Sequence, residues 1–186
     1  MSLVGFKARN HRQQVGRRGP NPKVDDRATA PEVFEPLHER FSFTIDVAAL
    51  PHNAKLPRYF TPDDDGLVQP WAGERVWCNP PYSGIEPWVQ KAWTSRAELV
   101  VMLLPANRTE QGWWQRHIEP RRDQPGGVRV EFLPGRMRFI AHDADGIKPN
   151  ERPPFGCCLV IWDRTPPVAA LGDHDTPAEG QRGEQA

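Results

Sequence analysis

A short apolar run that ends at two consecutive prolines is the feature that most constrains this chain. Residues 76–78, Val-Trp-Cys, have the β-branched and aromatic content of a buried strand. Pro80 and Pro81 cannot donate ladder hydrogen bonds, so this strand is predicted to end at Asn79. Each proline also fixes its own φ and keeps the residue before it out of the helical region. The sequence therefore predicts a stiff, non-helical loop that begins at the carboxyl end of a strand.

The side chains of this loop suit the binding of an aromatic amine. The Asn79 side-chain oxygen and the Pro80 carbonyl, which has no ladder partner, would offer two acceptors to an amino group with two hydrogens. Tyr82 adds a flat face on which a planar ring could stack. The structural alternative is a proline-stiffened turn in which Asn79 caps the following helix and Tyr82 is buried.

Length and composition indicate one soluble globular domain with polar arms. The chain has 186 residues, of which 38% are hydrophobic, enough for one core. No apolar run approaches the roughly 20 residues that span a bilayer, and the N-terminus lacks a signal-peptide core, so we expect a cytoplasmic protein. Residues 1–27 and 164–186 are predicted to be disordered arms on a domain of residues 28–163. The first 23 residues hold six Lys or Arg side chains and no acid, which fits nonspecific phosphate binding and plain solvation equally.

The rest of the pattern predicts alternating strands and helices. A helix is expected to start with Thr29 as its cap and Pro31 in its first turn, and to be kinked or shortened at Pro36. A second, amphipathic helix is predicted over residues 84–96, and a third, short one around Trp113 and Trp114. Strands are predicted at residues 43–49, 98–105, 128–133, 137–140 and 157–162. This order indicates an α/β sheet.

Two further features limit the fold. Only about thirty residues separate Asp46 from Asn79, too few for a full set of βα units between them, so the sheet is expected to be pared down. The three cysteines are Cys78, Cys157 and Cys158. Their spacing is not that of metal ligands, so they are predicted to be small buried hydrophobic residues, and no metal site is expected.

Asp46 interrupts an otherwise apolar predicted strand. In doubly wound α/β folds ligands bind at the carboxyl ends of strands, where an acid commonly receives a hydroxyl or an ammonium group. A ligand contact and a purely structural acid are both open for Asp46. The later run of acids, residues 63–65, fits a solvated turn before Gly66.

The segment Asn79-Pro80-Pro81-Tyr82 resembles the catalytic signature, [Asn/Asp/Ser]-Pro-Pro-[Tyr/Phe/Trp], of amino-methyltransferases that use S-adenosylmethionine (SAM). From Thr29 to Trp162 the order of features is similar to the phage-type, Dam-like DNA N-6-adenine methyltransferases. The segments that carry this resemblance are Phe-Thr-Ile-Asp-Val-Ala-Ala, Asp-Gly-Leu-Val-Gln-Pro-Trp, Val-Trp-Cys-Asn-Pro-Pro-Tyr-Ser, Val-Met-Leu-Leu-Pro-Ala and Leu-Pro-Gly-Arg-Met-Arg-Phe-Ile. The resemblance implies a Rossmann-like, SAM-dependent methyltransferase fold that methylates the exocyclic nitrogen of adenine in double-stranded DNA.

The resemblance also implies roles for particular residues. Asn79, Pro80, Pro81 and Tyr82 would form the catalytic loop. Thr29, in the Thr-Ala-Pro segment, would contact the cofactor. Asp46 and Ala48 would contact it from the Asp-Val-Ala-Ala turn, which lacks the family's usual glycines. An acid would meet the SAM adenine, and the candidates for it are Asp64 and Asp65.

Five basic residues are predicted to contact DNA from segments near the catalytic face: Arg108, Arg136, Arg138, Lys148 and Arg152. Simple surface exposure accounts for each of them as well. The target base would have to be flipped out of the duplex, and methyl transfer to it would be direct, without a covalent enzyme intermediate.

Two other functions remain open at this point. The same signature occurs in enzymes that methylate RNA bases or a protein glutamine amide. A noncatalytic DNA-binding module on a decayed methyltransferase fold is also compatible with the missing glycines. Neither the recognition sequence nor the oligomeric state can be predicted.

Overall fold

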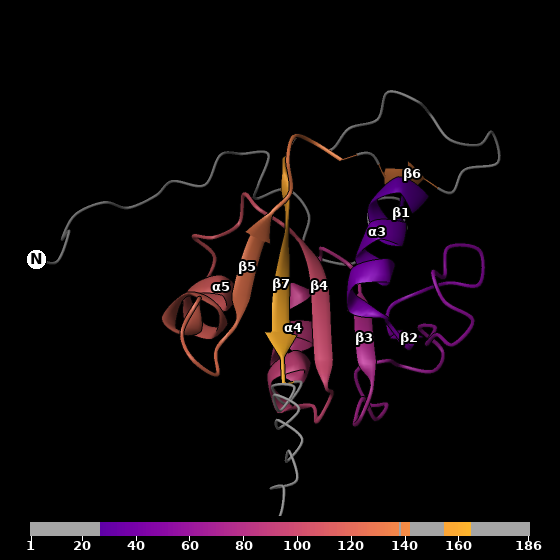
Figure 1. The fold of residues 1–186 in the computed structure, drawn as a ribbon, viewed down its shortest axis with the longest axis horizontal. Helices are drawn as coiled ribbons and strands as arrows, with labels where there is room; N and C mark the ends of the chain where they lie inside the picture. The colour runs from indigo at the N-terminus through magenta and orange to yellow at the C-terminus, as the bar shows by residue number, and fades with distance from the viewer. Residues whose placement is uncertain (1–26, 138, 142–154, 165–186) are drawn as a thin grey trace, which may run out of the picture.

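The computed structural model describes residues 27–137, 139–141 and 155–164 (Figure 1). The elements in chain order are β1 (Arg27–Thr29), α3 (Pro31–Phe41), β2 (Ile45–Asp46), β3 (Arg75–Cys78), α4 (Ile85–Thr94), β4 (Leu99–Pro105), α5 (Gly112–His117), a 3-10 helix η1 (Glu119–Arg121), β5 (Arg129–Phe132), β6 (Phe139–Ala141) and β7 (Cys157–Asp163). The predicted arms lie almost wholly outside the described residues, so the domain boundaries stay predictions.

The main sheet has five strands in the order β2-β3-β4-β7-β5. β2, β3 and β4 are parallel to one another, whereas β7 runs antiparallel to both of its neighbours, β4 and β5. The predicted α/β class is therefore confirmed as a mixed sheet with helices, and the more specific Rossmann-like assignment stays a prediction. Because the parallel strands share one direction, β2, β3 and β4 end at the same edge of the sheet.

Side-chain alternation along the strands builds a core on each face of the sheet. In β4 all seven residues are buried, as predicted for a central strand covered on both sides. Val100, Met102 and Leu104 join a cluster with α4 and α5, and the alternate residues of the strand join a second cluster with α3. Figure 1 accordingly shows α3 in front of the sheet and α4 behind it. The result is a three-layer α/β arrangement.

The first helix differs from its prediction at both ends. Thr29 is the last residue of β1, not the cap; the cap position is Ala30, which makes no side-chain cap bond. The helix also continues through Pro36 to Phe41. Its apolar face packs Phe34 and Phe41 against Phe43, and this tertiary packing offsets the missing backbone donor of the proline.

The strand predicted over residues 43–49 is shorter than expected, because β2 has only Ile45 and Asp46. The Asp46 carboxylate accepts backbone N–H groups of Ala48 and Lys55, and these bonds curl the chain into a turn directly after the strand. Residues 47–74, all described, contain no helix, and the link between β2 and β3 is therefore irregular. The expectation of a pared-down sheet at this place is confirmed.

A small second sheet lies beside α3. β1 pairs antiparallel with β6, and Thr29 is opposite Phe139. The segment Pro-Gly-Arg at residues 134–136, between the strands predicted at 128–133 and 137–140, does not form a hairpin, because β5 pairs with β7 while β6 pairs with β1. Gly135 in this connection has φ 67°, a conformation that suits glycine.

Burial of the cysteines agrees with their predicted role. All three are free and buried in the structure: Cys78, Cys157 and Cys158. Within the described residues, no cluster of three or more His, Cys, Asp or Glu side chains could bind a metal ion. Over the same part of the chain, no helix combines the length and apolar character needed to cross a membrane.

Candidate active site

The candidate site lies where the parallel strands β2 and β3 end. Asp46 is the last residue of β2, and Asn79 follows the last residue of β3. The two strands are in register, with Asp46 opposite Trp77. Ligands of open α/β sheets bind outside the carboxyl ends of the strands, and two cavities open at this edge.

The larger cavity has a volume of about 550 Å³ and mostly apolar walls. It lies between the turn after β2, the loop of residues 60–67, the start of the predicted catalytic loop (residues 79–82) and α4. Its lining residues are Val47, Ala48, Ala49, Leu50, Asn53, Phe60, Thr61, Pro62, Asp65, Gly66, Leu67, Asn79, Pro81 and Trp88.

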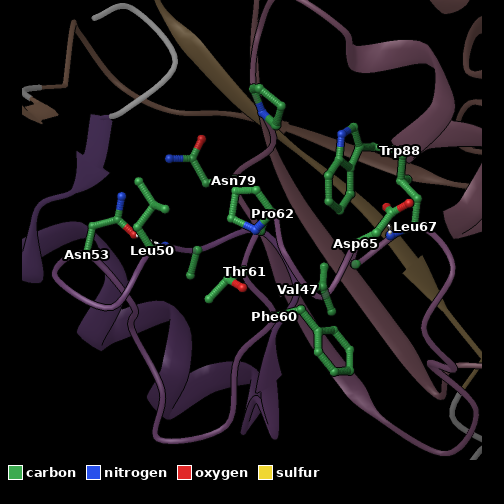
Figure 2. A pocket seen from close by; sticks show the side chains of 14 residues that line it. Val47, Leu50, Asn53, Phe60, Thr61, Pro62, Asp65, Leu67, Asn79 and Trp88 are labelled. Atoms are coloured by element: carbon green, nitrogen blue, oxygen red, sulfur yellow. Dashed lines mark hydrogen bonds between the residues drawn. The ribbon is translucent and has the colours of Figure 1, made fainter. Parts of the chain in front are cut away.

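The labelled lining residues of this cavity include two groups on opposite sides. Figure 2 shows Trp88 grouped with Asp65 and Leu67 on one side, and Asn53 with Leu50 on the other. Trp88 is half-buried and stacks on Trp71 with their ring centroids 6.3 Å apart. Trp88 packs on the core, and it also lines the cavity.

The smaller cavity, about 20 Å³, is polar and shares Ala48, Asn53 and Asn79 with the larger one. Its other lining residues are Ala28, Thr29, Asp46, Lys55 and Trp77. The structure thus brings together four of the five predicted cofactor residues, Thr29, Asp46, Ala48 and Asp65, around two adjoining cavities that meet at Asn79.

Asn79 connects the catalytic loop to β1. Its side-chain Nδ2 donates a hydrogen bond of 3.4 Å to the Thr29 hydroxyl, which directs the side-chain oxygen away from Thr29. The alternative that Asn79 caps the following helix is wrong. α4 begins at Ile85, its cap position is Gly84, and no side chain makes a cap bond there.

Asp46 is buried, with only 3% of its surface exposed. Burial raises the pKa of this carboxyl group to about 6, although the backbone hydrogen bonds from Lys55 and Ala48 and the charge of Lys55 act in the opposite direction. The carboxylate is therefore ionised at neutral pH but weakly solvated. Such a group can bind a cationic partner more strongly than an exposed acid can.

Tyr82, the last residue of the predicted catalytic loop, lies in a packed environment. Its hydroxyl donates a hydrogen bond of 3.3 Å to the Leu103 carbonyl, and burial raises the pKa of this hydroxyl well above its usual value. The ring meets Phe139 edge-on and Phe155 at a tilt, with centroid distances of 6.2 and 6.1 Å. Tyr82 and Pro80 do not line either of the two cavities, whereas Pro81 lines the larger one.

The two acids proposed for the SAM adenine differ in position. Asp64 accepts hydrogen bonds from the backbone and hydroxyl of Thr61, and these bonds lower the pKa of the carboxyl group. It closes a turn and lies outside both cavities. Asp65 has φ 52° and lines the larger cavity on the side of Trp88. The structure therefore favours Asp65 as the acid that faces a ligand.

The predicted DNA contacts are placed only in part. Arg108 follows β4 and donates a hydrogen bond to the Tyr82 carbonyl, and Arg136 is exposed on the connection between β5 and β6. Arg138, Lys148 and Arg152 lie outside the described residues.

Several cavity residues were not predicted from the sequence. Asn53 accepts the Leu50 N–H through its side chain at 2.7 Å and lines both cavities. Phe60, Gly66 and Leu67 come from a loop whose sequence has no regular period. Gly66 could have been identified as a glycine in a turn, directly after three acids, because glycine is often used where two backbone segments approach closely.

Replacing Gly66 by alanine is expected to lower the free energy of unfolding by about 1–3 kcal/mol, because the new methyl group would overlap the Val47 carbonyl oxygen and contact Trp88 at 3.3 Å. The Val47 carbonyl belongs to the backbone at the cavity wall and cannot rotate away. Urea unfolding at neutral pH is the measurement. Gly84→Ala is the matched control, because its methyl group would meet no atom within 4 Å. Equal stabilities of the two variants would contradict the close approach.

Comparison with known proteins supports the resemblance seen in the sequence. The family model described as DNA N-6-adenine-methyltransferase (Dam) matches residues 17–185. A DNA N-6-adenine-methyltransferase of Haemophilus phage HP1 (strain HP1c1) is 36% identical over 160 residues, which cover 81% of this chain and 87% of the phage protein. The predicted family is confirmed: the chain belongs to the DNA N-6-adenine-methyltransferase (Dam) family.

Proposed function

We propose that this protein is a site-specific DNA methyltransferase that transfers a methyl group from SAM to the exocyclic N6 amine of a flipped adenine in double-stranded DNA. The single observation that carries the proposal is the position of Asn79. It stands at the carboxyl edge of the sheet, lines a cavity of cofactor size and has its side-chain nitrogen directed to Thr29. Family membership supplies the reaction class.

The larger cavity fits SAM in size and in the character of its walls. Its 550 Å³ lies within the usual range of about 300–1,000 Å³ for small-molecule sites. The SAM adenine would stack on Trp88, with Asp65 as the acceptor for its amino group. The methionine end would extend past Ala48 toward Asp46, whose buried carboxylate would receive the ammonium group. In this orientation the methyl group would lie near Asn79, which lines both cavities.

Bound SAM supplies an electrophilic methyl group on a positively charged sulfur. The residues of the catalytic loop would orient the nucleophile. The Asn79 side-chain oxygen and the Pro80 carbonyl would accept the two N6 hydrogens, which makes the nitrogen lone pair more available for the new N–C bond. SAM would supply the methyl group as an electrophile and leave as the neutral thioether, and N6 would release one proton to solvent water. This catalysis relies on orientation and preorganised acceptors rather than on a covalent enzyme intermediate.

Base flipping and DNA binding would involve residues around this loop. Unstacking and unpairing one base costs a few kcal/mol, and a face of the Tyr82 ring would offset part of that cost by stacking, at about 1–3 kcal/mol. Arg136 and the basic residues at positions 138, 148 and 152 are proposed to contact phosphates. Because the HP1 protein is a DNA enzyme by name and the family model specifies DNA, the comparisons favour DNA over RNA or protein glutamine as the substrate.

The direct test is methylation of a defined duplex by the purified protein with SAM that carries a labelled methyl group. We expect the label in N6-methyladenine after digestion, and no reduction of the rate by competing RNA or glutamine-containing peptide. Sequencing with modified-base detection on DNA from cells that express the protein would give the recognition sequence. Binding of SAM and DNA without any labelled base would instead support the noncatalytic DNA-binding module.

A further inference from the structure

The loop after β4 contacts the catalytic loop through one arginine. Arg108 Nη1 donates a hydrogen bond of 2.6 Å to the backbone carbonyl of Tyr82, and the guanidinium group is half-buried. Arg108 itself is fixed in a turn, because its carbonyl accepts the backbone N–H of Gln111 at 3.1 Å. A charged donor at this distance makes one of the stronger hydrogen bonds found in proteins.

Tyr82 is held by hydrogen bonds at two points, its side-chain hydroxyl and its backbone carbonyl. The Tyr82 hydroxyl is bonded to the Leu103 carbonyl of β4, and the Tyr82 carbonyl is bonded to Arg108, which follows β4. Both ends of the residue are therefore tied to the same neighbouring strand and its loop. Rotation of the Tyr82 ring or shift of its backbone would break at least one of these bonds.

The position along the loop explains why such a bond is needed. Pro80 and Pro81 restrict the backbone up to residue 81, but beyond Tyr82 the chain continues through Ser83 and Gly84 to α4. The loop itself supplies a bond from the Gly84 N–H to the Pro81 carbonyl. Arg108 adds a connection to the rest of the domain at the residue where the stiffness from the prolines ends.

We propose that Arg108 is a positioning residue for the methyl-transfer reaction: it holds Tyr82, and through it the Asn-Pro-Pro segment, in the geometry that receives the target base. This inference rests on the proposed function. It assigns Arg108 a role different from the phosphate contact predicted from its sequence position, because its observed partner is a catalytic-loop carbonyl.

The two roles give opposite results for Arg108→Met. As a positioning residue, Arg108 should affect the rate at saturating DNA, and we expect a fall of about 10–100-fold, since small misplacements of reacting groups are that costly. The affinity for SAM and the salt dependence of DNA affinity should stay unchanged. A lost phosphate contact would instead weaken DNA binding, reduce the salt slope by about one and leave the saturated rate intact.

Two matched variants separate the bond from the charge. Arg108→Lys keeps a charged donor with shorter reach and should recover part of the rate. Arg96→Met removes an equal charge from an exposed position before β4, at the opposite edge of the sheet from the catalytic loop, and should keep the wild-type rate. Melting curves and SAM titrations check that each variant is folded.

A spectroscopic readout tests the position of Tyr82 without any activity. The chain has only two tyrosines, so 3-fluorotyrosine labelling should give two fluorine resonances, which Tyr59→Phe assigns. Arg108→Met should shift or broaden the resonance of Tyr82 and leave that of Tyr59 in place, while Arg96→Met should change neither.

Failure of the inference can be distinguished from failure of the proposed function. If the wild-type protein methylates DNA and Arg108→Met reaches the same saturated rate with an unchanged Tyr82 resonance, the positioning role is wrong. If the wild-type protein transfers no methyl group to DNA, the proposed function is wrong, and the fluorine spectra alone then decide whether Arg108 positions Tyr82.

Discussion

Replacing Asn79 by alanine is expected to lower the single-turnover rate of DNA methylation by about 10²–10³-fold, the loss typical when one preorganised polar group that acts in the transition state is deleted. The Asn79 side-chain oxygen would no longer accept a hydrogen from the target amine. Affinities for SAM and for DNA should change little, because neither depends on that oxygen in the ground state. The measurement is single-turnover methylation of an adenine-containing duplex.

The controls for Asn79 use its position in the structure. Asn79→Asp keeps an acceptor oxygen, as the family signature allows, and should retain more activity than alanine. The bond from Asn79 to Thr29 is long, 3.4 Å, so its loss should cost about 1 kcal/mol of stability or less, which a melting curve will show. A folded Asn79→Ala protein that methylates at the wild-type rate would remove the basis for the proposed reaction.

Replacing Asp46 by asparagine is expected to weaken SAM binding by about 10–100-fold, since a charge-assisted hydrogen bond worth about 1.5–3 kcal/mol would be lost. Asparagine is preferable to alanine here, because Asp46 is buried and accepts two backbone N–H groups, so that alanine would also disturb the turn after β2. The asparagine side chain keeps the size and one acceptor. Calorimetric titration measures the change.

The pH dependence provides a second test of Asp46. Because burial raises the pKa of this carboxyl to about 6, wild-type affinity for a cationic ligand should rise with pH through about 6 and then level off, as the carboxylate becomes ionised. Asp46→Asn should lack this rise. A SAM affinity of the wild type that is flat from pH 5 to 7.5 would assign Asp46 a structural role.

The same pKa fixes the sign of the effect on stability. The folded carboxyl binds its proton more tightly than the unfolded one, whose pKa is near 3.8, so the contribution of Asp46 favours folding below pH 4 and is lost as the pH rises through about 6. The loss amounts to about 3 kcal/mol at most. Ligand-free wild-type protein should show this slope in urea unfolding, and Asp46→Asn should not.

The parts of the fold that were predictable are those where side-chain pattern and burial agree. The apolar run of β4 indicated a central strand, and the two prolines placed the end of the preceding strand at Asn79, one residue beyond the observed end of β3 at Cys78. The hydrophobic pattern did not predict the length of β2, because local side-chain hydrogen bonds turn the chain there. The Asp46 carboxylate ends β2 after two residues, which no periodicity reveals.

The candidate site shows the same division. Asn79 was predicted because it lies where an apolar strand meets two prolines, and Asp46 because a carboxylate interrupts an apolar run. The walls of the cavity were not found, since Phe60 and Gly66 lie in an irregular loop whose path depends on long-range contacts. The bond from Arg108 to Tyr82 joins loops from two neighbouring strands, a contact that requires the sheet order before it can be inferred.

The pairing of β1 with β6 gives the catalytic loop an indirect dependence on distant parts of the chain. Thr29 and Phe139 are opposite each other in this ladder; Thr29 contacts Asn79, and Phe139 contacts Tyr82. One cross-strand pair thus supports both residues proposed to handle the target base. Short two-stranded ladders open more readily than central sheets. Removal of Arg27 and Ala28, the two β1 residues before Thr29, would therefore loosen the reactive loop while the five-stranded core stays folded, and the loss of activity would arise without any change to a residue proposed to touch a substrate.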